Sequence, residues 1–147
     1  MDTVLRESDY VNISCLLNDS TYHLIGEKEL RKMKKTAFLI NTARGAIIDE
    51  AALVKVLQEG LIRGAGIDAF EQEPTPADNP LLKMDKVVVA PHALAWTDHM
   101  FLVQWEQITR QLSQIIKGEC PEALANKEVW DSPGFQKKLK AFLTATG

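Results

Sequence analysis

Cysteine is scarce in this chain of 147 residues, which contains only Cys15 and Cys120. These two positions lack the spacing of metal ligands, and two cysteines are too few for a disulfide framework in a chain of this length. The sequence therefore predicts no metal site. A reduced, cytoplasmic protein is the default interpretation of this cysteine usage.

Positive charge is also in short supply, because 17 Lys and Arg stand against 20 Asp and Glu, for a formal net charge of −3. Proteins that bind nucleic acids neutralise phosphates with a clustered surplus of basic side chains. The acidic balance therefore argues against a nucleic-acid partner. The short basic run of Lys32, Lys34 and Lys35 is interpreted as the solvated end of a helix.

No apolar run approaches the ~18 residues that a membrane-spanning helix requires. The first ten residues, MDTVLRESDY, are polar and acidic, unlike a signal peptide. We therefore expect no membrane partner. Apolar residues at 46% and charged residues at 25% are ordinary for a globular protein, which excludes a disordered tail or a coiled coil.

Short apolar runs alternate with helix-like segments along the chain. Strands are predicted at 10–17, 37–41, 64–70 and 86–90. Helices are predicted at 27–33, from a cap at Asp49 to a stop at Gly60, at 97–117 with a cap at Thr97 or Asp98, and after Pro133. Because the strands are continuous apolar runs, the pattern indicates an α/β fold with a parallel sheet and helices on both faces.

Candidate catalytic side chains follow three of these strands, at the sheet edge where parallel sheets bind ligands. Arg44 comes directly after the second strand and can grip a carboxylate with two parallel hydrogen bonds. Glu73 follows the third strand and His92 the fourth, so the two side chains can meet if these strands are neighbours. A carboxylate stabilises a protonated imidazole and orients it for acid–base catalysis.

Each of these residues also has a plainer interpretation. Arg44 can pair with a surface acid, His92 can cap the helix that follows it, and Glu73 can lie in a solvated loop. His23, in the segment TYHLIG, is interpreted as structural.

Four stretches resemble, in order and spacing, the D-isomer-specific 2-hydroxyacid dehydrogenases: SDYVNISCLLNDSTYHLIG, NTARGAIIDEAAL, GAGIDAFEQEP and VVVAPH. The resemblance implies an NAD(P)-linked oxidoreductase that reduces small 2-oxo acids or oxidises 2-hydroxy acids. It implies that Arg44 binds the substrate carboxylate, that His92 exchanges the hydroxyl proton, and that Glu73 hydrogen-bonds the histidine.

The same resemblance implies a set of cofactor-binding residues: Cys15, Thr42, Ala43, Arg44, Asp68 and His92. NAD is the expected cofactor, and NADP is the alternative. The Gly-rich loop GxGxxG of the family is not found in this sequence. The only similar stretch, GLIRGAG, precedes a strand and so does not have the position of a phosphate loop.

We therefore interpret the chain as the C-terminal half of a dinucleotide-binding domain, a partial Rossmann-like sheet at 1–118, followed by a tail at 119–147 that resembles the return to a substrate domain. Such a truncated piece is expected to bind NAD weakly and to have little activity alone, so whether it is an enzyme is left open. The alternative is a non-catalytic truncated or domain-swapped binding module, or a corepressor-like relative. An exposed edge on the 10–17 strand predicts a homodimer or a domain-swapped oligomer.

Overall fold

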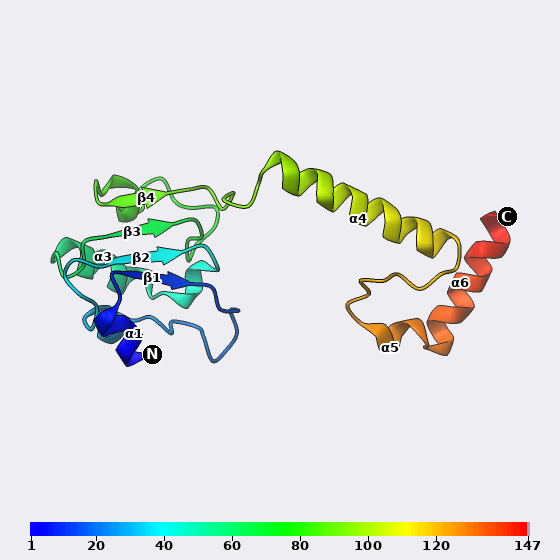
Figure 1. The fold of residues 1–147 in the computed structure, drawn as a ribbon, viewed down its shortest axis with the longest axis horizontal. Coiled ribbons are helices and arrows are strands. Elements are labelled where there is room, and N and C mark those ends of the chain that lie inside the picture. The colour runs from blue at the N-terminus through cyan, green and yellow to red at the C-terminus, as the bar shows by residue number, and fades with distance from the viewer. Residues whose placement is uncertain (147) are drawn as a thin grey trace. The chain divides into compact units, whose positions relative to one another are not determined.

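Four short apolar runs form one parallel sheet in the computed structural model of the chain, which describes residues 1–146. The strands are β1 (Tyr10–Ile13), β2 (Phe38–Asn41), β3 (Gly64–Ile67) and β4 (Val87–Val89). Their spatial order equals their order in the sequence, and each neighbouring pair is parallel (Figure 1). This arrangement confirms the predicted α/β fold class.

The strand register brings the carboxyl ends of all four strands to the same edge of the sheet. Ile13 pairs with Asn41, Asn41 with Ile67, and Ile67 with Val89. The strands are shorter than predicted because pairing stops at this row. The segments that follow it, including 14–17 and 68–70, leave the ladder and form the loops of the carboxyl edge.

One face of the sheet packs against three helices of the first unit: α1 (Asp2–Glu7), α2 (Glu27–Leu30) and α3 (Glu50–Gln58). Leu5, Leu30 and Leu53, one from each helix, share a buried core with Leu39 of β2. Burial alternates along β1 and β2, so their other face is exposed or half-buried. Helices were predicted on both faces of the sheet, and in the first unit they cover one face of β1 and β2. Helix α1 was not predicted, because its segment is short and mostly polar.

Helix α3 begins and ends where the sequence indicates. The Asp49 side chain accepts a hydrogen bond from the Ala52 amide at 3.0 Å and caps the first turn. Gly60 follows the helix with φ of 66°, the left-handed conformation that glycine adopts without strain. The short 3₁₀ helices η1 (Gly45–Ile47) and η2 (Pro80–Lys83) lie in the loops after β2 and β3.

The chain divides into two compact units, Met1–Leu94 and a second that begins at Ala95. The second unit contains α4 (Asp98–Ile116), α5 (Lys127–Trp130) and α6 (Pro133–Thr146). Of the two predicted caps for α4, the structure selects Thr97, whose hydroxyl accepts the Met100 amide at 3.1 Å. Through residue 146, no helix is both long and apolar enough to cross a membrane. The division at 118 stays a prediction about domains.

Candidate active site at the carboxyl edge of the sheet

His92 and Glu73 meet at the carboxyl edge, as the sequence predicts for neighbouring strands. His92 follows β4, Glu73 lies in the loop after β3, and the imidazole Nδ1 is 3.0 and 2.9 Å from the two carboxylate oxygens. The pair lines a cavity of about 340 Å³ together with Phe70, Pro74, Thr75 and Pro91. Because Nδ1 faces the carboxylate, Nε2 is the ring nitrogen that points away from this contact.

Glu73 is held as a carboxylate by its surroundings. The hydrogen bond with His92 is the main cause that keeps the pKa of Glu73 below its usual value, and the Phe70 amide and the positive charge of Arg44 act in the same direction. The Phe70 amide donates to Oε1 of Glu73 at 3.1 Å. An ionised Glu73 can therefore orient the imidazole and stabilise its protonated form.

The backbone of His92 is in the left-handed region, with φ of 54°. Such a conformation costs about 1–3 kcal/mol for a residue with a side chain, and it persists only where neighbours enforce it. Asp68, which is only 6% exposed, holds the two residues that follow: its oxygens accept the amides of Ala93 at 3.0 Å and Leu94 at 3.3 Å. Asp68 therefore fixes the turn that presents His92.

Arg44 stands at the start of η1, with an exposed side chain whose Nη1 donates to the Ala43 carbonyl at 2.7 Å. Its loop is clamped by Asn41, a fully buried residue at the end of β2. Asn41 donates through Nδ2 to the Arg44 carbonyl at 2.9 Å and accepts the Ala43 amide at 3.0 Å. Asn41 was not predicted as a site residue, although an amide at the end of an apolar strand was a usable signal.

Gly45 brings the Arg44 loop against the loop that carries Glu73. A Cβ at this position would collide with the carbonyl of Phe70 and the amide of Glu71. Glycine is thus required here because two backbone segments touch. The arginine loop and the glutamate loop are packed as one assembly.

Three of the predicted cofactor-binding residues, Cys15, Ala43 and Arg44, line a second cavity of about 390 Å³ beyond β1 and β2. Thr42 is exposed in the same loop and is not part of that lining. Asp68 and His92 lie farther along the edge, after β3 and β4. The structure thus spreads the predicted set along one edge of the sheet.

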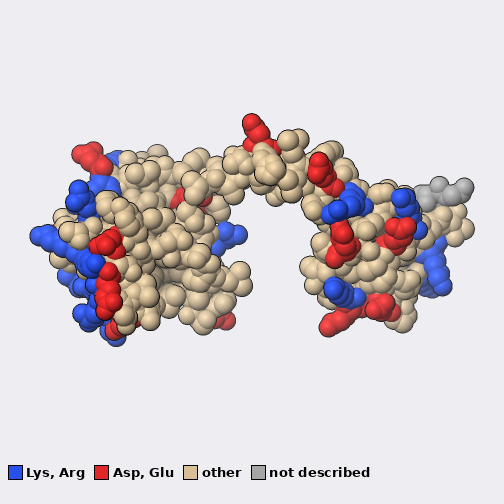
Figure 2. Space-filling view, in the orientation of Figure 1, with Lys and Arg blue, Asp and Glu red and all other residues tan. Residues whose placement is uncertain are grey.

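Two of the three lysines of the basic run form ion pairs on the first unit. Lys32 and Lys34 of the basic run lie 2.8 and 3.0 Å from carboxylate oxygens of Asp2 and Asp9, and Figure 2 shows basic and acidic side chains interspersed on this unit. The run therefore offers no isolated positive patch. Among residues 1–146, no group of three or more His, Cys, Asp or Glu is placed to hold a metal ion.

Comparisons with known proteins agree on one family. A sequence model of the NAD-binding domain of D-isomer-specific 2-hydroxyacid dehydrogenases matches residues 1–93. A glyoxylate reductase of Thermofilum pendens is 54% identical over 129 residues, which are 88% of this chain and 38% of that protein. A glyoxylate/hydroxypyruvate reductase B of an Enterobacter species is 53% identical over 92 residues, 63% of this chain and 28% of its own length.

A solved structure shares the fold as well. The D-isomer-specific 2-hydroxyacid dehydrogenase of Lactobacillus delbrueckii ssp. bulgaricus, in its NAD-complexed form, superposes with a TM-score of 0.80 at 38% identity. The match covers 84% of this chain and 42% of that one. This chain therefore spans about two fifths of the length of such relatives.

Proposed function

Because this chain belongs to the D-isomer-specific 2-hydroxyacid dehydrogenases, within their NAD-binding domain, we propose that it carries the catalytic edge of an oxidoreductase. The reaction is hydride transfer between NAD and a small 2-oxo or 2-hydroxy acid. The observation that carries this proposal is the His92–Glu73 pair, with Nδ1 2.9 Å from the nearer carboxylate oxygen, and with the loop of Glu73 packed against that of Arg44.

His92 is proposed as the acid–base catalyst. With Nδ1 held by Glu73, the ring donates a proton through Nε2 to the oxygen of a 2-oxo acid as the carbonyl is reduced, and accepts it back in the reverse direction. An ionised Glu73 stabilises the imidazolium that this cycle requires. The low pKa of Glu73 supports this division of roles.

Arg44 is proposed to bind the substrate carboxylate. Its exposed guanidinium presents a planar fork of donors, and its present hydrogen bond is to the neighbouring Ala43 carbonyl. A carboxylate is a better acceptor for that fork, because charge-assisted pairs are shorter and stronger than neutral ones. The positive charge also polarises the adjacent 2-oxo group.

We propose that Cys15, Thr42, Ala43, Arg44, Asp68 and His92 contact the nicotinamide end of NAD. The second cavity, lined by small and apolar groups with one cation, suits a flat ring and its ribose. When bound, NAD donates or accepts the hydride at C4 of that ring. Binding to this chain alone is expected to be weak, because pyrophosphate needs a Gly-rich turn at a helix N-terminus and this sequence has none.

The name of the Thermofilum relative supports glyoxylate as the first substrate to test. Hydroxypyruvate is the second, from the name of the Enterobacter relative.

An oligomer is proposed from the exposed edge of the sheet. β1 pairs with β2 on one side only among the described strands, and Tyr10 is 67% exposed. Unpaired strand edges favour association, so we expect a homodimer or a domain-swapped oligomer. A strict monomer in light scattering across a concentration series would refute this. We also propose a cytoplasmic location, and an NAD-binding part at 1–118 followed by a tail at 119–147.

The test of function is NAD binding followed by residue-resolved NMR. At millimolar NAD, we expect shift changes at the amides of Cys15, Ala43 and Ala93, and weaker changes in Arg44→Ala. The matched control is Arg63→Ala, away from this edge, which is expected to leave the titration unchanged. Robust NADH oxidation with glyoxylate by the chain alone would overturn the expectation of little activity, and absence of shift changes at the edge would overturn NAD binding there.

A further inference from the structure

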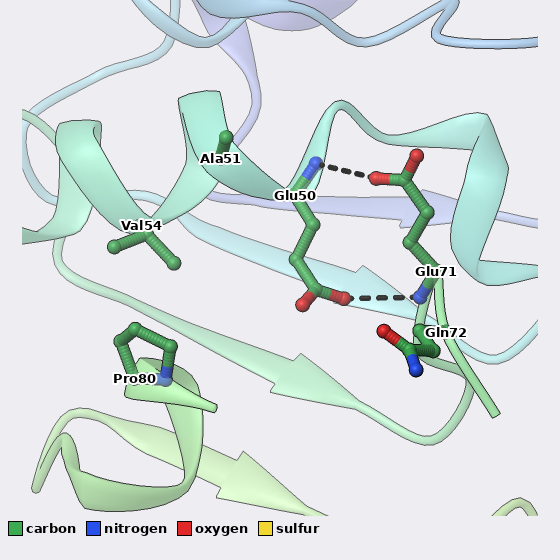
Figure 3. Close-up of a pocket in the computed structure, with 6 residues that line it drawn as sticks. All are labelled: Glu50, Ala51, Val54, Glu71, Gln72 and Pro80. Atoms are coloured by element: carbon green, nitrogen blue, oxygen red, sulfur yellow. Dashed lines mark hydrogen bonds between the residues drawn. The ribbon is translucent and has the colours of Figure 1, made fainter. Parts of the chain in front are cut away.

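Glu71 stands two residues before Glu73 and joins three separate segments of the first unit. Its Oε1 lies 2.7 Å from Nε2 of His23, in the loop before α2. Its Oε2 accepts the Glu50 amide at 3.2 Å, and its own amide donates to the Glu50 carboxylate at 3.0 Å (Figure 3). This reciprocal pair ties the loop after β3 to the first residue of α3.

The Glu71 carboxylate suits its place at the start of α3. The first amides of a helix have no partner within the helix, and the helix dipole favours a negative charge there. Glu50 is anchored in turn, because its Oε1 accepts Nδ2 of Asn79 at 2.6 Å and Asn79 is only 7% exposed. Glu50, which holds Glu71, is therefore itself held by a buried side chain.

His23 is itself fixed before it meets Glu71. Its backbone is left-handed, with φ of 48°, and its amide donates to the Ala46 carbonyl at 2.9 Å. Its ring stacks on Tyr22 with centroids 4.0 Å apart. The interpretation of His23 as structural is thus extended: this histidine holds a glutamate that lies 48 residues away in the sequence.

The contacts of Glu71 and Glu73 share one short loop. The Phe70 amide donates to Glu73, the next amide donates to Glu50, and Gly45 packs against the peptide between Phe70 and Glu71. A shift of the Glu71 backbone is therefore expected to reach the adjacent residue Phe70, whose amide is a direct partner of the Glu73 carboxylate.

We propose that Glu71, held by His23 and Glu50, is a positioning residue that sets the geometry of the Glu73–His92 pair. It touches neither reacting atom and acts through the loop. The relevance of Glu71 to catalysis rests on the proposed function. The effect of Glu71 on the geometry of the Glu73–His92 pair does not depend on that function.

NMR of the three histidine rings tests this without cofactor or substrate. Glu73→Gln defines the Nδ1 signal of a His92 without its carboxylate. In Glu71→Ala, the His92 Nδ1 signal is expected to move toward that value. The Phe70 amide is expected to exchange several-fold faster, which is less than the roughly tenfold or greater acceleration expected when a hydrogen bond to a charged group is removed outright. Glu71→Gln keeps an acceptor for the Glu50 amide and is expected to restore most of the wild-type signal.

The matched control is Gln72→Ala, in the same loop and between the two glutamates, which is expected to leave both readouts unchanged. An unchanged His92 signal in folded Glu71→Ala overturns the proposal, as does an equal shift in Gln72→Ala. If Glu71→Ala does not fold, His23→Ala is judged by the same two readouts, because it removes one contact of Glu71 and leaves those to Glu50. Both readouts are measured without NAD, so they test the positioning role of Glu71 even if the chain binds no NAD. The NAD titration tests the proposed function separately.

Discussion

Replacing Asn41 with alanine isolates the clamp that shapes the arginine loop. Asn41 is 0% exposed, and its amide makes two hydrogen bonds, to the Arg44 carbonyl and from the Ala43 amide. Each bond contributes about 1 kcal/mol net, and a buried partner left unsatisfied costs about 1–3 kcal/mol more. Because both partners lie in a half-buried loop, water replaces part of the loss, and we expect Asn41→Ala to destabilise the first unit by about 2–3 kcal/mol.

Native-state hydrogen exchange is the suitable assay, because it follows amides of the sheet itself, whereas all three tryptophans lie in the second unit. The amide of Leu39, a fully buried residue of β2, is a direct probe. A loss of about 2–3 kcal/mol raises its exchange rate roughly 30- to 150-fold when exchange requires unfolding of the unit.

Asn12→Ala is the matched control, because Asn12 is an exposed asparagine on neighbouring β1. A surface change of this kind is expected to alter stability by less than about 0.5 kcal/mol. If Asn41→Ala accelerates exchange of Leu39 less than about threefold, or no more than Asn12→Ala does, the two hydrogen bonds of the clamp do not stabilise the loop as argued.

Three further changes probe the same edge. Gly45→Ala places a Cβ against the Phe70–Glu71 peptide and is expected to destabilise the folded chain by at least about 2 kcal/mol. The control is Gly26→Ala, because a Cβ at position 26 has room. Equal thermal midpoints for the two variants would contradict this prediction. The folded pKa of Glu73 lies below its ordinary value, so its stabilising contribution is present above the unfolded pKa and is lost as pH falls through the folded pKa. Glu73→Gln is therefore expected to be less stable than wild type near pH 6, by less than about 1 kcal/mol because the pair is partly solvated. This difference in the free energy of unfolding is expected to shrink in acid. A difference that grows as the pH falls would refute the argument. Asp49→Ala removes the cap of α3 and is expected to cost about 1 kcal/mol in urea denaturation, whereas Asp49→Asn is expected to retain most of it.

Local patterns were sufficient to predict the sheet and the ends of its main helices. Asp49 and Gly60 were identifiable, and the cap of α4 was narrowed to Thr97 or Asp98, because capping chemistry depends on residues three or four positions apart. The meeting of Glu73 and His92 was predicted on the condition that their strands are neighbours, since parallel strands place their carboxyl ends together, and the family resemblance implied their hydrogen bond. The catalytic roles of these residues stay predictions.

Contacts between loops were not predictable in the same way. The His23–Glu71 pair depends on a side-chain conformation and on segments 48 residues apart, and the need for glycine at 45 depends on a backbone that only the folded chain brings there. Sequence patterning also extended the strands too far, because an apolar residue such as Leu17 packs against the core after the ladder has ended. Hydrophobicity reports burial, whereas a strand also requires a partner for its backbone.

The carboxyl edge explains how a short stretch of sheet can hold the His92–Glu73 pair and the Arg44 loop in place. Asp68 fixes the turn after His92, Asn41 fixes the loop of Arg44, and Glu71 fixes the loop of Glu73. Each of these three polar residues forms hydrogen bonds with main-chain groups, so each sets the position of a loop backbone. The orientation of the candidate side chain in that loop is then set by that side chain's own contacts. A substitution in one anchor should therefore change the geometry of its own loop first. The other loops should follow only through the close packing at Gly45, which predicts that Asp68→Asn perturbs the amides of 93 and 94 more strongly than those of 43 and 44.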